Sequence, residues 1–152
     1  MHDVMVAFNI QEEGAKPPPG HKHILLHLVF DVKMDFHRKA RLVAGGHLTD
    51  PPETLTYSSV VSRESVCITF LITALMDLDI LMTDIGNAYL NAPTSEKVYT
   101  IAGQEFGEYA GRIVIIVWAL YGLKSAGASW RSHLASMLCD MGFQSCMADP
   151  DV

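Results

Sequence analysis

Apolar residues in the first third of the chain gather in short runs that predict strands. The run 23–32 is rich in Ile, Leu, Val and Phe, and a second run, 38–44, ends at a pair of glycines. Two strands joined by about five residues predict a β-hairpin. Residues 11–20 are polar and end in three prolines and a glycine, which predicts an extended arm. We therefore expect residues 1–22 to form an arm or linker and residues 23–152 to form the folded unit.

Helical spacing of apolar residues appears twice in the rest of the chain. The first stripe follows Ser62, a candidate N-cap, and predicts a helix over 63–77. The second stripe includes Trp130 and Leu134 and predicts a helix over 125–141, closed by Gly142. An order of hairpin, helix, three strands and helix is an α+β pattern. The three strands are expected at 79–85, 97–101 and 113–118, with loops at 49–59 and 103–111.

Composition narrows the class of protein. The 152 residues are 49% apolar and 18% charged, which is typical of one globular domain with a core. The longest mostly apolar stretches, 66–76 and 113–120, fall short of the roughly 20 residues that cross a membrane. The first residues lack the basic start and apolar run of a signal peptide. We expect a soluble, intracellular protein without a membrane partner.

The titratable residues exclude some site types and leave others open. Three cysteines without a CxxC pair argue against a disulfide framework or a cysteine zinc site. His23 and His27 share a predicted strand face, but a strand separates them by about 13 Å, too far for one metal. The net charge of −6 argues against nucleic-acid binding, yet residues 16–41 hold six basic and two acidic residues. This segment could face phosphates.

One carboxylate has neighbours that indicate a metal site. Asp84 closes the predicted strand 79–85 and is followed by Gly86 and Tyr89. A carboxylate at a strand end can point into a cleft and bind Mg²⁺ through oxygen. The alternative is an N-cap aspartate of a short helix.

Two further runs could bind phosphate. The run 119–130 places Lys124 and several small residues just before a helix, and a helix N-terminus attracts phosphate. The alternative is an ordinary turn and helix start. The strand residues Arg38, Lys39 and Arg41 could contact a triphosphate or a template backbone, the alternative being a solvated hairpin face.

Taken together, these runs resemble the reverse transcriptase of Ty1/copia-type retrotransposons. They occur in the order of that family and close to its spacing, over roughly residues 24–152. Each run is weak alone, whereas the ordered set is specific. The matching runs are 38–46 (RKARLVAGG), 57–65 (YSSVVSRES), 81–91 (LMTDIGNAYLN), 119–124 (ALYGLK), and Gly142-Phe143 followed by Ala148-Asp149-Pro150.

The resemblance implies a partial right-hand polymerase fold, with fingers and palm and an incomplete palm sheet. Asp84 matches the first catalytic aspartate, a ligand of Mg²⁺ or Mn²⁺. Tyr89 matches the tyrosine that packs under the incoming sugar and excludes a 2′-hydroxyl, so deoxynucleotides are the expected substrate. Residues that match nucleotide- or template-binding positions are Lys39, Arg41, Ile85, Gly86, Tyr89, Tyr121, Gly122 and Lys124.

Two departures from the family pattern matter. Family members commonly carry Gln-Ala-Pro-Arg where this chain has residues 125–128, Ser-Ala-Gly-Ala, so the role of that arginine has no counterpart here. The Tyr-x-Asp-Asp strand that brings the other metal-binding aspartates is absent from these 152 residues, which contain no Asp-Asp pair. Two metal ions need several carboxylates. We therefore expect no polymerase activity from this chain alone.

The resemblance also implies partners and a location. In the complete enzyme the partners are an RNA/DNA template-primer, a deoxynucleoside triphosphate and the remainder of the Pol polyprotein. The expected location is a cytoplasmic virus-like particle or the nucleus. Two alternatives remain open: a non-catalytic module that binds nucleic acid or protein, and a retroelement relic without function.

Overall fold

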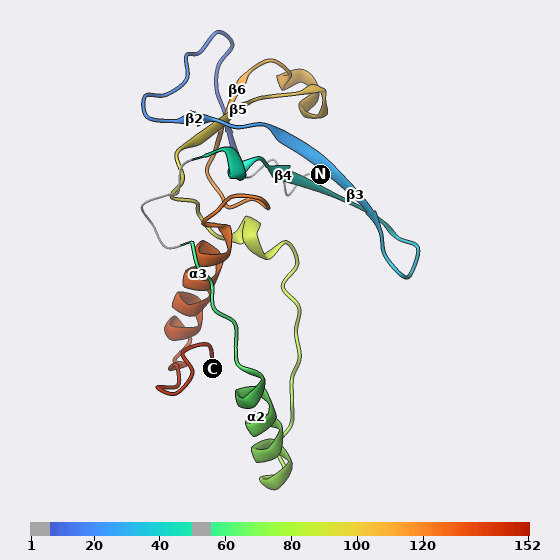
Figure 1. The fold of residues 1–152 in the computed structure, drawn as a ribbon, viewed down its shortest axis with the longest axis vertical. Helices are drawn as coiled ribbons and strands as arrows, with labels where there is room; N and C mark the ends of the chain where they lie inside the picture. The colour runs from blue at the N-terminus through green and yellow to red at the C-terminus, as the bar shows by residue number, and fades with distance from the viewer. Residues whose placement is uncertain (1–6, 50–55) are drawn as a thin grey trace.

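A four-stranded sheet forms the upper part of the molecule in the computed structural model, which describes residues 7–49 and 56–152 (Figure 1). Its strand order is β1 (Phe8–Ile10), β6 (Ile113–Ile116), β5 (Val98–Ile101) and β2 (Lys22–His23). β6 is antiparallel to both of its neighbours, and β2 is parallel to β5. β1 is a three-residue strand in a region where the sequence shows no clear period, because so short a strand leaves none to detect.

The predicted hairpin is confirmed as a second sheet of two antiparallel strands, β3 (Leu26–Val32) and β4 (Arg38–Ala44). The register runs from Leu26 opposite Ala44 to Val32 opposite Arg38. The first strand begins three residues later than predicted. The reason is Ile24, which is buried in the core and donates its backbone N–H to the Tyr99 carbonyl at 2.9 Å. The start of the apolar run therefore belongs to the four-stranded sheet, and the rest of the run forms the hairpin strand β3.

Both predicted helices are confirmed, within one or two residues at each end. α2 (Arg63–Leu75) begins as expected after Ser62, whose Oγ accepts a hydrogen bond from the Ser65 N–H at 3.1 Å. α3 (Ala126–Asp140) is followed by Gly142, which has a φ of +94° and closes the helix end as expected. No helix of the described residues is long and apolar enough to cross a membrane. The described residues also form three short 3₁₀ segments: η1 (Gly46–Leu48), η2 (Ala88–Asn91) and η3 (Gln104–Tyr109).

The strand predicted over 79–85 is wrong. This segment is extended, but it pairs with no strand in the described part of the chain and runs alone from α2 to η2 (Figure 1). Leu81 and Met82 are 93% and 84% exposed. An apolar run becomes a strand only where a sheet edge offers backbone partners, and no such edge lies beside this one. The mixture of helices and small sheets still agrees with an α+β class.

The core lies around β5 and β6. Val114 and Ile116 of β6 are buried there, and Phe8 packs edge-on against Phe106 with ring centroids 5.2 Å apart. Residues within the 119–124 run join the same cluster, notably Leu120 and Leu123. The core therefore holds the first part of the predicted phosphate-binding run 119–130, on both sides of Tyr121 and Gly122.

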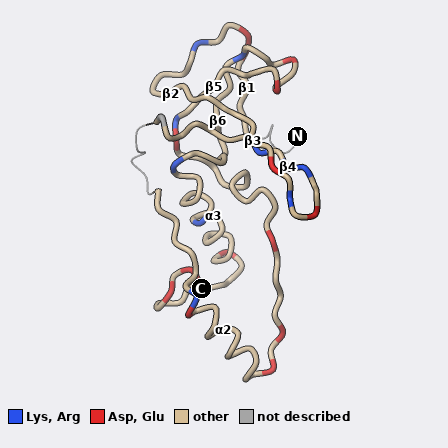
Figure 2. The backbone as a smooth tube through the Cα atoms, turned by 45° about the vertical axis from the view of Figure 1, so that its right-hand side comes forward, with Lys and Arg blue, Asp and Glu red and all other residues tan. Residues whose placement is uncertain are grey.

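α2 contributes nothing to that core. None of its residues is buried, and Phe70 and Leu75 are 51% and 76% exposed. After Glu64 the helix has no charged residue, as its tan colour in Figure 2 shows. The chain exposes 11220 Å² in total, whereas a compact protein of 16.7 kDa exposes about 7600 Å². The helical apolar stripe is therefore present as predicted but faces solvent.

Candidate functional site

Two tyrosines from separate predicted motifs meet beside the core. Tyr89 lies on η2, and Tyr121 lies in the loop before α3. Their ring centroids are 4.9 Å apart, with an interplanar angle of 55°. Both side chains are half-buried. The fold thus brings the end of the 81–91 run against the 119–124 run.

The backbone of the Tyr121 loop is attached to the end of β4. The Tyr121 carbonyl accepts a hydrogen bond from the Ala44 N–H at 2.7 Å, and Val43 forms a parallel bridge with Tyr121. Gly122 has a φ of +92°, and a Cβ there would lie 2.0 Å from the Ala44 carbonyl oxygen. A Cβ on Gly46 would likewise lie 2.3 Å from the Gly122 carbonyl oxygen. Both positions therefore require glycine. We call this contact the glycine junction (Ala44–Gly46 with Tyr121–Gly122).

Lys124 and Ser125 are held from two sides. The Lys124 Nζ donates a hydrogen bond to the Thr49 carbonyl, so the ammonium group lies against the segment that follows the glycine junction. Ser125 donates from both its backbone N–H and its Oγ to Glu96 Oε1, at 2.7 Å each. Glu96 is 8% exposed and Ser125 is 1% exposed. The first backbone N–H of the α3 region thus has a carboxylate acceptor from a distant segment.

Glu96 was not singled out in the sequence, because a single glutamate beside a short strand carries no pattern. A hollow of about 620 Å³ borders α3 and was also not foreseen. Its hydroxyl groups and one guanidinium are of the kinds that contact nucleic-acid phosphates. They belong to Thr94, Ser95, Ser129, Ser132, Ser136 and Arg131.

Asp84 is exposed and lies in the extended segment that leads into η2. The next residues, Ile85 and Gly86, are also exposed, and the Gly86 carbonyl accepts a hydrogen bond from Asn91 Nδ2 at 3.4 Å. Within residues 7–49 and 56–152, no three His, Cys, Asp or Glu side chains are grouped so that they could hold a metal ion. A divalent cation takes several oxygen ligands, so a metal at Asp84 needs ligands beyond those that the described residues group around it.

Lys39 and Arg41 lie on β4 of the hairpin. Arg41 forms an ion pair with Asp31 at 3.6 Å, and Lys39 is directly opposite Asp31 in the strand register. Figure 2 shows that both signs of charge occur along this hairpin. Arg41 shares a strand face with Val43, which bridges to Tyr121, so the basic strand leads into the glycine junction.

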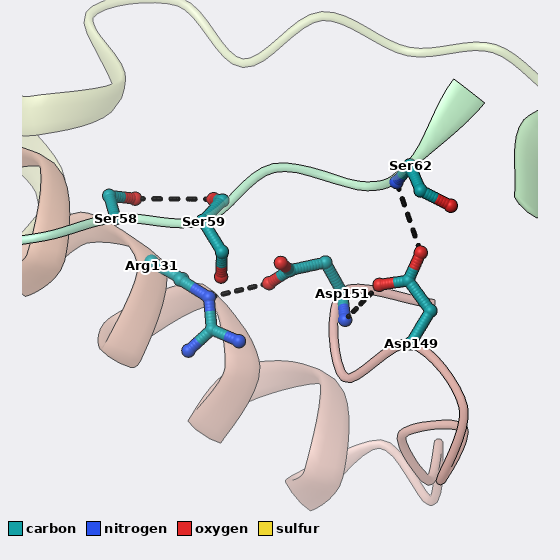
Figure 3. A network of polar contacts seen from close by, with 6 residues as sticks. All are labelled: Ser58, Ser59, Ser62, Arg131, Asp149 and Asp151. Carbon is teal, nitrogen blue, oxygen red and sulfur yellow. Dashed lines mark hydrogen bonds and ion pairs between the residues drawn. The ribbon is translucent and has the colours of Figure 1, made fainter. Parts of the chain in front are cut away.

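A network of carboxylates connects the Ala148-Asp149-Pro150 run to both helices (Figure 3). Asp149 Oδ2 accepts hydrogen bonds from the Ser62 N–H at 3.0 Å and from Ser65 Oγ at 2.6 Å. Asp149 Oδ1 accepts from the Asp151 N–H at 3.2 Å, and Arg131 Nε of α3 donates to Asp151 Oδ1 at 2.5 Å. We call these five residues the carboxylate clasp.

Hydrogen bonds set the charge state of the clasp. The hydrogen bond from Ser65, followed by the backbone N–H groups of Ser62 and Asp151, lowers the pKa of Asp149 from 3.8 to about 2. The hydrogen bond from the Ser59 side chain, with Arg131 as a second cause, lowers the pKa of Asp151. Both carboxylates are therefore charged near neutral pH.

Comparisons with known proteins agree with the family resemblance of the sequence. A family model described as reverse transcriptase (RNA-dependent DNA polymerase) matches residues 13–150. The Transposon Ty1-NL2 Gag-Pol polyprotein of Saccharomyces cerevisiae is 35% identical over 121 residues, which cover 74% of this chain and 7% of that protein. The Transposon Ty1-DR4 Gag-Pol polyprotein of the same yeast is 34% identical over 115 residues, 72% of this chain and 7% of that protein. No solved structure matches.

Replacing Gly122 with alanine tests the glycine junction. The added Cβ meets the Ala44 carbonyl oxygen and also suffers from the positive φ, so we expect Gly122→Ala to cost about 3 kcal/mol of unfolding free energy. Gly111 also has a positive φ, +84°, but open space around it. Gly111→Ala is the matched control and should cost about 1 kcal/mol. Urea denaturation measures both, and equal costs would contradict the close approach.

Removing the Glu96 carboxylate tests the buried cap of α3. Glu96→Ala leaves the buried N–H and Oγ of Ser125 without their acceptor, and we expect a loss of about 2 kcal/mol of unfolding free energy. Glu96→Gln keeps one acceptor oxygen and should lose less. Glu108 is exposed, so Glu108→Ala should change stability by less than about 0.5 kcal/mol. The cap has no energetic role if Glu96→Ala behaves like this control in urea denaturation.

The lowered pKa of Asp149 predicts how stability depends on pH. Because folding favours the charged carboxylate, its contribution is complete above the ordinary pKa of 3.8 and is lost as the pH falls towards about 2. The difference in unfolding free energy between the native chain and Asp149→Asn should therefore be constant from about pH 5 to about pH 7 and shrink below about pH 4. Asp79→Asn, an exposed aspartate of the extended segment, serves as the control. A difference that stays the same at every pH contradicts the assignment.

Proposed function

Because this chain belongs to the reverse transcriptase (RNA-dependent DNA polymerase) family and is of its Ty1/copia type, we propose that it supplies fingers and palm residues of a polymerase that adds deoxynucleotides to a primer. The chain spans 7% of the length of each Gag-Pol relative. We propose that it acts as part of such a polyprotein, with an RNA/DNA template-primer and a deoxynucleoside triphosphate as partners.

The contact between Tyr89 and Tyr121 is the observation that supports this proposal best. In the proposed enzyme Tyr89 packs under the sugar of the incoming nucleotide and excludes a 2′-hydroxyl. Tyr121, Gly122 and Lys124 line the same pocket. The two motifs are distant in the sequence, yet their aromatic rings touch, with centroids 4.9 Å apart. One nucleotide could contact both motifs only if they lie together.

The other predicted residues take roles around this contact. Lys39 and Arg41 would bind the triphosphate, since β4 leads into the glycine junction beside Tyr121. Ile85 and Gly86 would approach the nucleotide through backbone atoms. In this arrangement the basic side chains would neutralise the negative charge of the triphosphate. The backbone of Ile85 and Gly86 would be accessible to the nucleotide.

Asp84 would be one ligand of Mg²⁺ or Mn²⁺. In two-metal polymerases these ions neutralise charge on the transferred phosphoryl group and activate the attacking hydroxyl. The described residues group no three potential metal ligands around Asp84, so further ligands are needed for a complete metal site. We therefore propose that the 152-residue chain alone does not extend a primer.

A combined binding and extension assay tests the proposal. The purified chain should bind a primed RNA template, with an affinity that falls as salt rises because bound counterions are released. It should add no deoxynucleotide in the presence of Mg²⁺ or Mn²⁺. Arg41→Ala should weaken binding and reduce the salt slope by about one. Fluorescence anisotropy measures binding, and gel electrophoresis of a labelled primer measures extension.

The controls separate the possible outcomes. Lys97→Ala removes a basic residue next to β5, outside the proposed nucleotide pocket, and should leave binding unchanged. Binding without extension supports the assigned surface. Extension by the chain alone overturns the proposal that these residues lack a complete metal site, and absence of salt-dependent binding overturns the nucleic-acid role of this surface.

A further inference from the structure

We propose that Asp149 is a positioning residue that holds α2 in one orientation relative to α3. This role depends on the carboxylate clasp and goes beyond the proposed polymerase function, because it needs no nucleotide, metal or template. The clasp connects the first turn of α2 to the side of α3 through one short C-terminal turn (Figure 3).

The contacts on the α2 side are specific to the start of that helix. Asp149 Oδ2 accepts hydrogen bonds from the Ser62 N–H and from Ser65 Oγ, 3.0 Å and 2.6 Å away. Ser62 Oγ in turn donates to Ser65 Oγ at 2.8 Å and accepts from the Ser65 N–H at 3.1 Å. A carboxylate at this place is also attracted by the positive end of the helix. Asp149 thus completes the cap that Ser62 begins.

A second set of hydrogen bonds connects Asp149 to α3. Asp149 Oδ1 accepts the Asp151 N–H, and Asp151 Oδ1 accepts a hydrogen bond from Arg131 Nε at 2.5 Å. The turn itself is closed by two backbone hydrogen bonds, from the Val152 N–H to the Asp149 carbonyl at 3.1 Å and from the Cys146 N–H to the Val152 carbonyl at 2.7 Å. Movement of either helix would therefore break contacts of charged groups.

Apolar packing does not supply this constraint. α2 has no buried residue, and it is joined to the rest of the chain by extended segments on both sides. The segment after α2 leads to Asp84, so the orientation of α2 fixes the starting point of the chain that carries this carboxylate. Polar contacts at one helix end therefore determine where the helix lies.

The native cysteines allow a direct measurement. Cys67 on α2 and Cys139 on α3 are free and exposed, and Cys146→Ser removes the third thiol. Nitroxide labels on Cys67 and Cys139 report the distance between the helices by double electron–electron resonance. Dilution with an excess of unlabelled chain restricts the signal to distances within one molecule. We expect one narrow distance distribution in this background.

Two substitutions should release α2. Asp149→Ala removes the acceptor, and Ser65→Ala removes the 2.6 Å donor from the other side. In both variants the distribution should broaden and lose its main maximum, while Asp149→Asn, which keeps a carbonyl oxygen, should lie between them and the parent. The matched control is Thr73→Ala, because the Thr73 hydroxyl donates only within α2, to the Thr69 carbonyl at 2.8 Å.

Circular dichroism distinguishes release of the helix from its unfolding. Broadening with unchanged helix content in Asp149→Ala or Ser65→Ala supports the positioning role. An unchanged distribution in both variants overturns it. If Asp149→Ala loses helix content, Ser65→Ala alone decides the question, since it keeps the carboxylate and the Ser62 N-cap.

Discussion

The glycine junction is the contact on which the rest of the arrangement depends. One backbone hydrogen bond of 2.7 Å joins Ala44 to Tyr121. Gly122 has no side chain, which allows these two segments of the chain to approach closely. Leu120 and Leu123, on either side, are buried in the core. The glycine junction therefore fixes the position of the hairpin relative to the tyrosine contact and to the start of α3. A shift at this junction would move the hairpin away from both.

Two different kinds of force hold the two parts of the molecule. Around β5 and β6, small and branched apolar residues exclude water, and the polar groups among them are paired, as Glu96 is with Ser125. At α2 the apolar residues face solvent, and the helix is held in place by hydrogen bonds to the Asp149 carboxylate of the C-terminal turn. Exposed charged contacts are weakened by salt through screening, whereas apolar burial is not weakened in this way. The two parts should therefore respond differently to ionic strength.

Local sequence patterns correctly predicted the secondary-structure elements that neighbouring residues determine. The hairpin follows from two apolar runs and a short turn, and α2 and α3 follow from helical spacing, the Ser62 cap and Gly142. The strand over 79–85 failed because pairing depends on a partner that the run itself does not encode. Ile24 divided the first apolar run between two sheets for a similar reason, since its backbone N–H pairs with the carbonyl of Tyr99, far along the chain.

The candidate site divides in the same way. Motif order indicated Tyr89 and Tyr121, and their contact follows from the fold. The acceptor role of Glu96 and the capping role of Asp149 depend on residues 29 and 87 positions away, so no local pattern signals them. The metal-ligand role of Asp84 stays a prediction, and the structure shows an exposed carboxylate in the segment that leads into η2.

The solvent-facing stripe of α2 has a consequence for how the molecule opens. An isolated helix of 13 residues is marginal in water, and α2 gains no burial to add to its own hydrogen bonds. Amide protons of α2 would therefore exchange with deuterium far sooner than those of β5 and β6, which are enclosed by the core. Protection of these amides would be a sensitive indicator that some surface has covered the helix. Backbone exchange rates, rather than any catalytic signal, thus report whether the apolar face of α2 is covered.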